Sequence, residues 1–283
     1  MRLNFGAVDY RATVWVNGTV VAWHEGGHTP FSCDITGTLS EEDNVLMVRA
    51  EDPPTDRYIP RGKQHWEPQA ASIFYARTTG IWQTVWLEPV SPSHLESIRI
   101  TPSLDGIVSV TAKISVPGQA QFVTMSISDD TRALASAMSL ADGPGAALSA
   151  QIPEPKLWSP DQPHLYMLHL ELHGPNGLLD SIDSYFGVRS VAAQDGKVLL
   201  NGNPIYLKTV LDQGYWPESN LTPPSDQAIQ DDIRIVKELG FNGVRKHQKV
   251  EDPRSCTGRT EWAFWSPPRW PMRTSLTKTP SRA

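Results

Sequence analysis

The sequence is poor in cysteine and has no long apolar run, and each absence excludes a class of protein. Its two cysteines, Cys33 and Cys256, belong to no spacing motif, which excludes a disulfide scaffold and a zinc knuckle. No stretch approaches 18 consecutive apolar residues, and the opening MRLNFGAVDY lacks the apolar segment of a signal peptide. We therefore expect no membrane partner, and the cysteine count favours a reducing, cytoplasmic compartment.

Charge and glycine patterns exclude further functions. The formal net charge is -6, which gives no reason to expect nucleic acid or an anionic membrane as a partner. The sequence contains no G-x-S-x-G motif, no P-loop and no G-x-G-x-x-G pattern, and we expect no cofactor. Tryptophan, by contrast, is abundant, with ten residues. Core packing is its ordinary use, and stacking on the apolar face of a sugar is the functional alternative.

One pentapeptide matches a metal-site motif. HEGGH (24–28) fits the H-E-x-x-H pattern of zinc proteases, which needs both histidines one turn apart on a helix. Two central glycines each cost about 1 kcal/mol in a helix. The preceding residues alternate like a strand, and Pro30 follows at once. The context therefore predicts a strand that runs into a loop, with no metal.

The first ninety residues alternate apolar and polar side chains between turn residues. The runs are YRATVWVNG (10–18), TVVAWHE (19–25), NVLMVRAED (44–52) and GIWQTVWLEPV (80–90). The first two predict a hairpin that turns at Asn17-Gly18, the strongest short signal for such a turn. No 3.6-residue pattern competes with the alternation. We expect residues 1–91 to form a β-sandwich.

A second series of β runs follows a proline-marked boundary at 89–92. Its members are LESIRITPSL (95–104), GIVSVTAKISV (106–116), AQFVTMSISD (120–129), ALSAQIP (147–153) and HLYMLHLELHG (164–174). Turn signals recur about every ten residues, which is typical of an immunoglobulin-like β-sandwich. We place this domain at 92–186.

The pattern then changes to strand, helix and strand. KVLLNGNPIYLKTV (197–210) predicts a hairpin that continues into a buried strand, and FNGVRKH (241–247) predicts a second strand. Between them, SDQAIQDDIRIVKELG (225–240) predicts an amphipathic helix. Its apolar stripe is Ile229, Ile233, Val236 and Leu239, with Ser225 as N-cap and Gly240 just past the end. This order predicts the first βα unit of a (β/α)8 barrel, at 187–254.

Polar residues follow both predicted strands at their carboxyl ends, where ligands bind in barrels and open α/β sheets. LDQGYWPES (211–219) supplies hydrogen-bonding groups and a stacking plane after the first strand. Arg245, Lys246 and His247 end the second strand. A sugar site is one interpretation, and a capped loop with a structural Asp212 is the other.

These segments resemble one enzyme family. GAVDYRATVWVNG (6–18), HTPFSCDITGTL (28–39) and ARTTGIWQTVWLEPV (76–90) resemble the sugar-binding jelly-roll domain of glycoside hydrolase family two, which includes β-galactosidases and β-glucuronidases. FGVRSV (186–191) and the segments that follow it to Arg254 resemble the start of that family's catalytic barrel. The resemblance implies hydrolysis of O-glycosidic bonds at a terminal β-linked sugar. It also implies sugar-binding roles for Asp212, Gln213, Trp216, Arg245 and His247.

Two departures from the family pattern bear on activity. Family members are retaining enzymes with two catalytic glutamates on later barrel strands, one of them in an Asn-Glu pair. No Asn-Glu pair occurs in this sequence, so no catalytic residue is carried over and we expect the chain to be inactive. The front of the jelly roll is also short by several strands, which predicts exposed sheet edges and apolar faces.

The last 29 residues match neither a folded domain nor the family. SCTGRTEWAFWSPPRWPMRTS (255–275) has no periodicity, yet its three tryptophans are unusual for a disordered tail. A permitted codon choice with one T restored after the Arg254 codon reads FLYWADRMGFLVSAEMANAYE, a helix and a strand. We therefore expect residues 255–283 to be an out-of-frame, disordered tail, which DNA sequencing across this junction tests. The alternatives to a hydrolase are a non-catalytic carbohydrate-binding module and a non-functional gene remnant.

Overall fold

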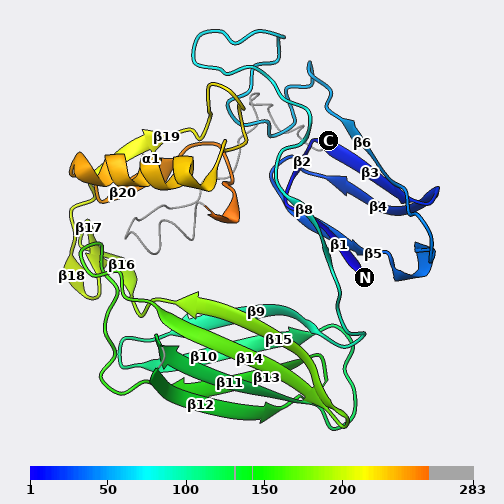
Figure 1. The fold of residues 1–283 in the computed structure, drawn as a ribbon. Helices are drawn as coiled ribbons and strands as arrows, with labels where there is room; N and C mark the ends of the chain where they lie inside the picture. Colours follow the sequence, from blue (N-terminus) through cyan, green and yellow to red (C-terminus); the bar gives the residue numbers. More distant parts are fainter. Residues whose placement is uncertain (131, 142, 255–283) are drawn as a thin grey trace, which may run out of the picture. The chain divides into compact units, whose positions relative to one another are not determined.

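The computed structural model describes residues 1–254 apart from 131 and 142. These residues form two units, of which the first contains 1–89 together with 208–254 and the second contains 90–207 (Figure 1). The predicted tail, 255–283, lies outside the described residues. Strands dominate, as the alternating sequence predicts. Across the described ranges, no helix has the length and apolar character needed to cross a bilayer.

Three small antiparallel sheets build the β part of the first unit. They are β5 (Phe31–Asp34), β1 (Arg2–Phe5) and β8 (Val85–Glu88); β4 (Thr19–Glu25), β3 (Arg11–Val16) and β6 (Leu46–Glu51); and β2 (Val8–Asp9) with β7 (Gly80–Ile81). A short 3-10 helix, η1 (Thr36–Thr38), follows β5. The inward positions of the alternating runs meet in one core, made of Leu3, Phe5, Val8, Ala12, Val14, Val16 and Ile35. The prediction of a β fold for this region is confirmed.

The predicted hairpin is present, with β3 and β4 joined at Asn17-Gly18. Both residues have positive φ angles, 50° and 79°, as the right-handed twist of a two-residue hairpin requires. The Asn17 side chain also donates to the Thr38 carbonyl and accepts from the Val45 backbone N–H. The turn residue therefore anchors two further segments of the sandwich.

The run 80–90 is not one strand, and this part of the prediction is wrong. It divides into β7 and β8 on either side of Trp82, which is buried. The indole nitrogen of Trp82 donates to the Gly27 carbonyl at 2.7 Å, 55 residues away in sequence. This bond holds the ring in the interior, and across residues 82–84 the chain passes from the sheet of β2 and β7 to the sheet of β5, β1 and β8.

HEGGH is a strand that runs into a loop, as its context predicts. β4 ends at Glu25, and Gly26 has a φ of 141°, a conformation that residues with side chains rarely adopt. His24 contacts Thr29 at 3.0 Å, while His28 is buried elsewhere. In the ranges that the structure describes, no group of three or more His, Cys, Asp or Glu side chains is placed to hold a metal.

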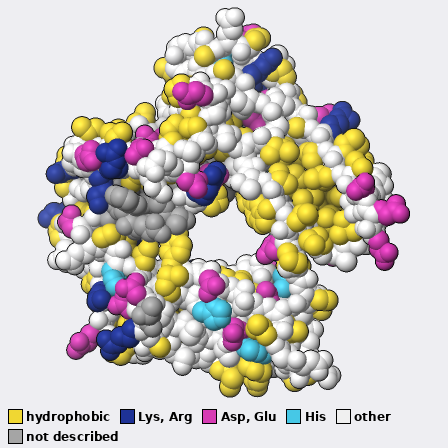
Figure 2. Space-filling model, viewed as in Figure 1, with side chains coloured by type: hydrophobic (Ala, Val, Ile, Leu, Met, Phe, Trp, Pro, Cys, Tyr) yellow, Lys and Arg dark blue, Asp and Glu magenta, His cyan; other side chains and the backbone are white. Residues whose placement is uncertain are grey.

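Several large apolar side chains of the first unit are exposed, as the sequence predicts. Across the sheet of β4, β3 and β6, Val20 and Met47 both pair with Trp15, and Trp23 lies further along β4 with 66% of its surface exposed. Figure 2 shows hydrophobic side chains gathered in a broad patch over the part of the molecule that holds β1 to β8. An apolar face of this kind favours self-association.

The second unit is mainly a two-sheet sandwich. One sheet orders β13 (Gly145–Gln151), β10 (Ile107–Ile114) and β9 (Leu95–Pro102), and the other orders β12 (Arg132–Leu140), β11 (Phe122–Asp129), β14 (Tyr166–Gly174) and β15 (Gly177–Phe186). Side chains along β10 alternate strictly between exposed and buried. They pack with inward residues of both sheets into one core. The architecture agrees with the predicted immunoglobulin-like sandwich.

Two strands of this unit, β12 and β15, are absent from the predicted runs. β12 carries mostly Ala and Ser, and of its three large apolar residues Met138 and Leu140 are exposed while Leu134 is partly buried. Alternation of apolar and polar residues is therefore weak in the sequence, and pairing with β11 defines the strand. A separate small sheet of β16 (Val191–Gln194), β17 (Lys197–Leu200) and β18 (Asn203–Pro204) ends the unit, and its predicted turn at Asn201-Gly202 is present.

The strand–helix–strand pattern is also present. β19 (Thr209–Asp212) and β20 (Gly243–Lys246) pair in parallel, and α1 (Asp226–Glu238) connects them. The Ser225 hydroxyl accepts from the Ala228 N–H at 3.0 Å, and Gly240 has a φ of 84° just past the helix. Of the predicted barrel, the described residues contain one βα unit and the strand that follows it.

Two details of this unit differ from the prediction. Leu239 is 69% exposed rather than part of the apolar stripe, and it is the C-cap residue that follows the last helical residue, Glu238. β19 is only half-buried, since α1 covers one face of the strand pair and Leu211 on the other face is exposed. Ile229, Ile233 and Val244 make the small core beneath the helix.

Candidate functional site

The parallel pair β19–β20 sorts its side chains onto two faces. Asp212 is opposite Lys246, and Leu211 is opposite Arg245. Val244 packs under α1, so Lys246, two residues later, points to the same side, and Arg245 points to the other. In a closed barrel the face away from the helices is the interior. Arg245 is therefore on the side where a barrel holds its ligand.

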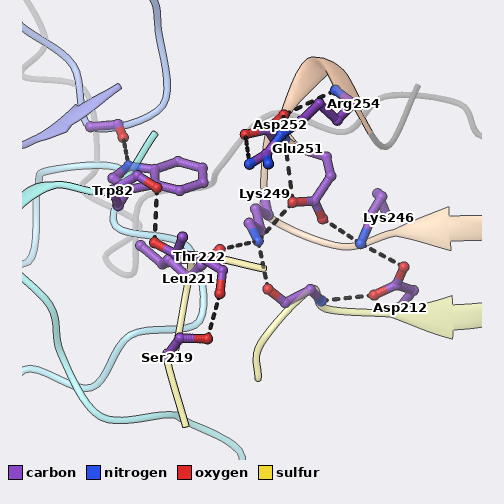
Figure 3. Close-up of polar contacts among 12 residues, drawn as sticks. Trp82, Asp212, Ser219, Leu221, Thr222, Lys246, Lys249, Glu251, Asp252 and Arg254 are labelled. Carbon is purple, nitrogen blue, oxygen red and sulfur yellow. Dashed lines mark hydrogen bonds and ion pairs between the residues drawn. The ribbon is translucent and has the colours of Figure 1, made fainter. Parts of the chain in front are cut away.

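Four charged side chains form a cluster at and just beyond the ends of β19 and β20. The buried ion cluster consists of Asp212, Lys246, Lys249 and Glu251 (Figure 3). Lys246 Nζ lies 2.5 Å from Asp212 Oδ2 and also pairs with Glu251 Oε2. Lys249 Nζ lies 2.8 Å from Glu251 Oε1. The two positive ammonium groups and the two negative carboxylates neutralise one another. Buried charges in proteins are normally paired in this way.

Glu251 is held ionised by its two lysine partners. Burial by itself would raise its pKa, but the ammonium groups of Lys246 and Lys249 outweigh burial and lower the pKa to about 2. Burial lowers the pKa of Lys249, and Glu251 opposes that change. The carboxylate therefore stays charged at neutral pH. It serves as a fixed anion between Lys246 and Lys249 rather than as a proton donor.

Lys249 connects the loop after β19 to the β-sandwich. Its side chain is fully buried, and Nζ donates to the carbonyls of Gly214 at 2.6 Å and Leu221 at 2.7 Å. The same ammonium lies 5.2 Å from the centre of the Trp82 ring. Figure 3 shows these groups converging from the sandwich, the loop and the segment after β20. One cation thus fixes both ends of the loop 213–222, which includes the predicted Gln213 and Trp216.

Aromatic and hydroxyl groups complete the fixation of this loop. Tyr215 stacks on Tyr75 with ring centres 4.0 Å apart, and Thr222 Oγ1 donates to the Trp82 carbonyl at 2.8 Å. Leu221 is buried against Ala7 and Trp82. The loop after β19 is therefore held against the sandwich near its start, by Tyr215, and at its end, by Leu221 and Thr222.

Gly214 fits this arrangement because it has no side chain. Its φ is 68°, and a Cβ there would lie 2.6 Å from Glu251 Oε2 and 2.8 Å from Lys249 Cδ. We expect Gly214→Ala to lower the free energy of unfolding by roughly 2 kcal/mol, because the left-handed backbone and the crowding both oppose the methyl group. Chemical denaturation measures this change, and Gly202→Ala, at a φ of 79° with open space around it, is the matched control. Equal losses in both variants would contradict the crowding argument.

The five predicted sugar-binding residues lie at or just after the ends of β19 and β20, on more than one face of the strand pair. Asp212 Oδ1 accepts from the Gly214 N–H at 2.7 Å and Oδ2 pairs with Lys246, so its contacts match the structural role that the sequence left as the alternative. Trp216 lines a small cavity beside α1 together with Asp212. Arg245 is on the opposite face of the strands. Gln213 and His247 each follow a strand end and are half-buried.

Sequence reasoning missed Lys249, Glu251 and Trp82 as parts of the site. The stretch KHQKVEDPR (246–254) is dense in mixed charges directly after a buried strand, and this was the available signal. A run of charged residues is usually a solvated surface, however, and nothing in its spacing shows that Lys249 is enclosed. The enclosing groups come from residues 82, 214 and 221.

Comparison with known proteins identifies the family. The model described as "Glycosyl hydrolases family 2" matches residues 93–189, and the one described as "Glycosyl hydrolase 2 galactose-binding domain-like" matches residues 1–81. The chain belongs to glycosyl hydrolase family 2. The resemblance expected from the sequence is confirmed, and the two matched ranges fall in the two β-sandwich regions.

The family 2 relatives of this chain are longer enzymes. A β-galactosidase from Thermoanaerobacter pseudethanolicus is 28% identical over 86% of this chain and 33% of its own length. A β-glucuronidase from Paenibacillus borealis is 28% identical over 87% of this chain and 42% of its own. A solved structure, the FMN-binding β-glucuronidase from Facaelibacterium prausnitzii L2-6, superposes with a TM-score of 0.80 at 26% identity, covering 97% of this chain and 43% of that one. The chain thus spans about a third to two fifths of these relatives.

Proposed function

We propose that this chain is the sugar-recognition part of a family 2 glycoside hydrolase that acts on a terminal β-linked sugar. The observation that carries the proposal is the parallel β19–α1–β20 unit, whose strand ends are locked to the β-sandwich through Lys249. A barrel presents its ligand site at the carboxyl ends of its strands. The relatives described as β-galactosidase and β-glucuronidase support a carbohydrate ligand.

Within this site we assign sugar contact to Gln213, Arg245 and His247. Arg245 lies on the face away from α1, and its guanidinium has the planar donor geometry that sugar hydroxyls and carboxylates accept. Gln213 and His247 follow the two strand ends directly. Asp212 and Trp216 shape the loop beside α1. The reaction of the whole enzyme is then double displacement through a glycosyl-enzyme, with two carboxylates that flank the scissile bond.

We further propose that the 283 residues do not catalyse this reaction by themselves. The sequence contains no Asn-Glu pair, the family's mark of the acid/base glutamate. Glu251, a buried carboxylate beside the strand ends, has its pKa lowered to about 2 and is enclosed by two lysines, so it is unsuited to proton donation at neutral pH.

An aryl-glycoside assay tests the proposed inactivity. The purified chain, incubated with nitrophenyl β-galactoside, β-glucuronide and β-mannoside, is expected to release no nitrophenol above a mock purification. Glu251→Gln is the matched variant, because it removes the charge of the buried carboxylate that follows β20. Turnover that depends on Glu251 would contradict the assignment, and turnover in any form of the pure chain would overturn the proposed inactivity.

Sugar binding without cleavage is the second candidate function. It is favoured because β19 and β20 direct Arg245 to one face and the buried ion cluster to the other. Arg245 is available on a face that α1 leaves uncovered, while the charged groups on the other face are committed to one another. Calorimetric titration with the same three sugars as methyl glycosides is expected to give a signal that Arg245→Ala abolishes. Under both candidate functions this chain binds the sugar and does not cleave it. The candidates differ in whether the larger protein that contains the chain is a hydrolase.

A further inference from the structure

The second unit has a cleft where β9 and β15 end. Its volume is about 370 Å³, within the range of roughly 300–1,000 Å³ that small-molecule sites occupy. The two strands and the segment after β15 supply its lining, which consists of Ile100, Pro102, Tyr185, Phe186, Gly187 and Arg189. None of these residues belongs to β19, β20 or the segments that follow them. The cleft therefore uses no residue of the sugar site proposed above.

Arg189 is the charged group of this cleft. Among the residues that the structure describes, its guanidinium makes no ion pair and no hydrogen bond, and burial lowers its pKa with no carboxylate to oppose the change. By contrast, the carboxylates of Glu238 and Asp231 raise the pKa of Arg234. Part of the Arg189 side chain remains exposed, so a ligand can reach it. A partly buried cation that has no counter-ion favours the binding of an anion.

A buried tryptophan positions this guanidinium. The central carbon of the Arg189 guanidinium lies 4.3 Å from the centre of the Trp158 ring, and Trp158 is 1% exposed. The Trp158 backbone N–H donates to the Val188 carbonyl at 2.8 Å, and Asn201 Nδ2 donates to the Trp158 carbonyl at 3.0 Å. A ring on one face of a guanidinium does not use its N–H donors, which lie in the guanidinium plane. The cation is therefore held in place with its donors still available to a ligand.

The composition of the walls selects among anions. Apart from Arg189, the lining residues are uncharged, and Ile100, Pro102 and Tyr185 provide carbon surface. Phosphate and sulfate are usually held by several cations or by a set of backbone N–H groups, and the described lining offers one cation. A hydrocarbon of the same size would leave the guanidinium without an anion. The ligand that matches these walls has one carboxylate on an apolar body.

We propose that this cleft binds a small monocarboxylate, with its carboxylate paired to Arg189 and its apolar body against Ile100, Pro102 and Tyr185. A guanidinium presents two parallel N–H donors that match the two oxygens of a carboxylate. The site goes beyond the proposed hydrolase function, because it belongs to the second unit and takes a ligand that is not a sugar.

Calorimetric titration and saturation-transfer NMR of the full chain with 3-phenylpropionate test the proposal. The uncharged 3-phenylpropionamide has nearly the same shape, and it is expected to bind at least about tenfold more weakly because it lacks the charge that pairs with the guanidinium. Arg189→Gln is expected to weaken 3-phenylpropionate binding by a similar factor. Arg99→Gln removes another exposed arginine of the second unit, outside the lining, and as the matched control it is expected to have no effect.

Two comparisons keep the test decisive if Arg189→Gln fails to fold. The acid and the amide are compared on the unmodified chain, and equal binding of the two would overturn the proposal. Arg189→Lys keeps the positive charge without the planar pair of donors, and it is expected to weaken binding severalfold. No binding of 3-phenylpropionate by the unmodified chain, unchanged binding in a folded Arg189→Gln, or an equal loss in Arg99→Gln would also overturn the assignment.

The strand-end variant Arg245→Ala separates this proposal from the proposed function. It is expected to leave 3-phenylpropionate binding unchanged while it abolishes the calorimetric signal of the methyl glycosides. Arg189→Gln is expected to have the reverse pattern. Loss of 3-phenylpropionate binding in Arg245→Ala would overturn the cleft assignment, whereas absence of glycoside binding in the unmodified chain would overturn the strand-end site alone.

Discussion

Lys249→Met is expected to lower the free energy of unfolding of the first unit by about 3–5 kcal/mol, the cost of breaking a buried ion pair by removing one partner. Methionine matches the length of lysine but cannot donate to the carbonyls of Gly214 and Leu221. It would also leave Glu251 with one cation in place of two. Both consequences act in the interior, where water cannot replace the lost bonds.

Thermal and urea denaturation measure this loss, and two further variants show its cause. Lys208→Met removes an exposed lysine of the same unit and is expected to change stability by less than about 0.5 kcal/mol. Lys249→Met combined with Glu251→Gln is expected to recover part of the loss, because the double variant no longer buries an under-neutralised carboxylate. If the double variant is less stable than the sum of the single ones, the ion cluster does not act as described.

Asp9→Asn is expected to change the pH dependence of stability by about 2–3 kcal/mol between about pH 5 and about pH 8. Asp9 is buried in the sandwich, where Gln64 Nε2 donates to Oδ2 at 2.7 Å. Burial raises its pKa from 3.8 to about 7, with Asp52 adding to the shift and Gln64 and Arg61 opposing it. The carboxyl group is therefore partly protonated in the folded protein at neutral pH.

The direction of the effect follows from which state holds the proton. Between pH 3.8 and about 7 the folded protein binds a proton at Asp9 that the unfolded chain has released. The stability that Asp9 contributes is thus fully present below its unfolded pKa and is lost as pH rises through about 7. His28 has the opposite effect. Its pKa is lowered from 6.5 to about 4, so stability is lost as pH falls from 6.5 through 4.

These two groups nearly cancel in the unmodified chain, and single variants separate them. Urea midpoints at both pH values are expected to rise with pH in Asp9→Asn, because the His28 effect then acts alone. They are expected to fall with pH in His28→Gln, because the Asp9 effect remains. Parallel pH profiles for the two variants would show that burial does not shift these pKa values in opposite directions.

Local chemistry in the sequence determined much of the fold. Asn17-Gly18 supplies the positive φ angles of a hairpin, and Ser225 and Gly240 mark the helix ends within one or two residues. Alternation along β10 predicted which side chains enter the core. Each of these features depends on neighbours a few residues apart, so a single sequence contains the necessary information. The family likeness drew on the same segments.

The candidate site depended on contacts that no local pattern encodes. The sequence predicted the strand ends and their polar residues, but it did not show that Asp212 and Arg245 lie on opposite faces, since that depends on which face α1 covers. Strand β12 escaped prediction because its small residues are selected by pairing with β11 rather than by burial.

The sequence by itself determined the β-rich order of elements, the βα unit and the family, because turns, caps and alternation are short-range properties. Only the tertiary structure decided that Lys249 is buried between the loop after β19 and Trp82, and that Trp86 is exposed while Trp82 is not. It also decided that His28 is buried with neither ring nitrogen hydrogen-bonded to a residue that the structure describes. Burial is set by segments more than 50 residues away, such as Gly27 for Trp82. A residue's surroundings, and with them its charge and bonding, follow from packing.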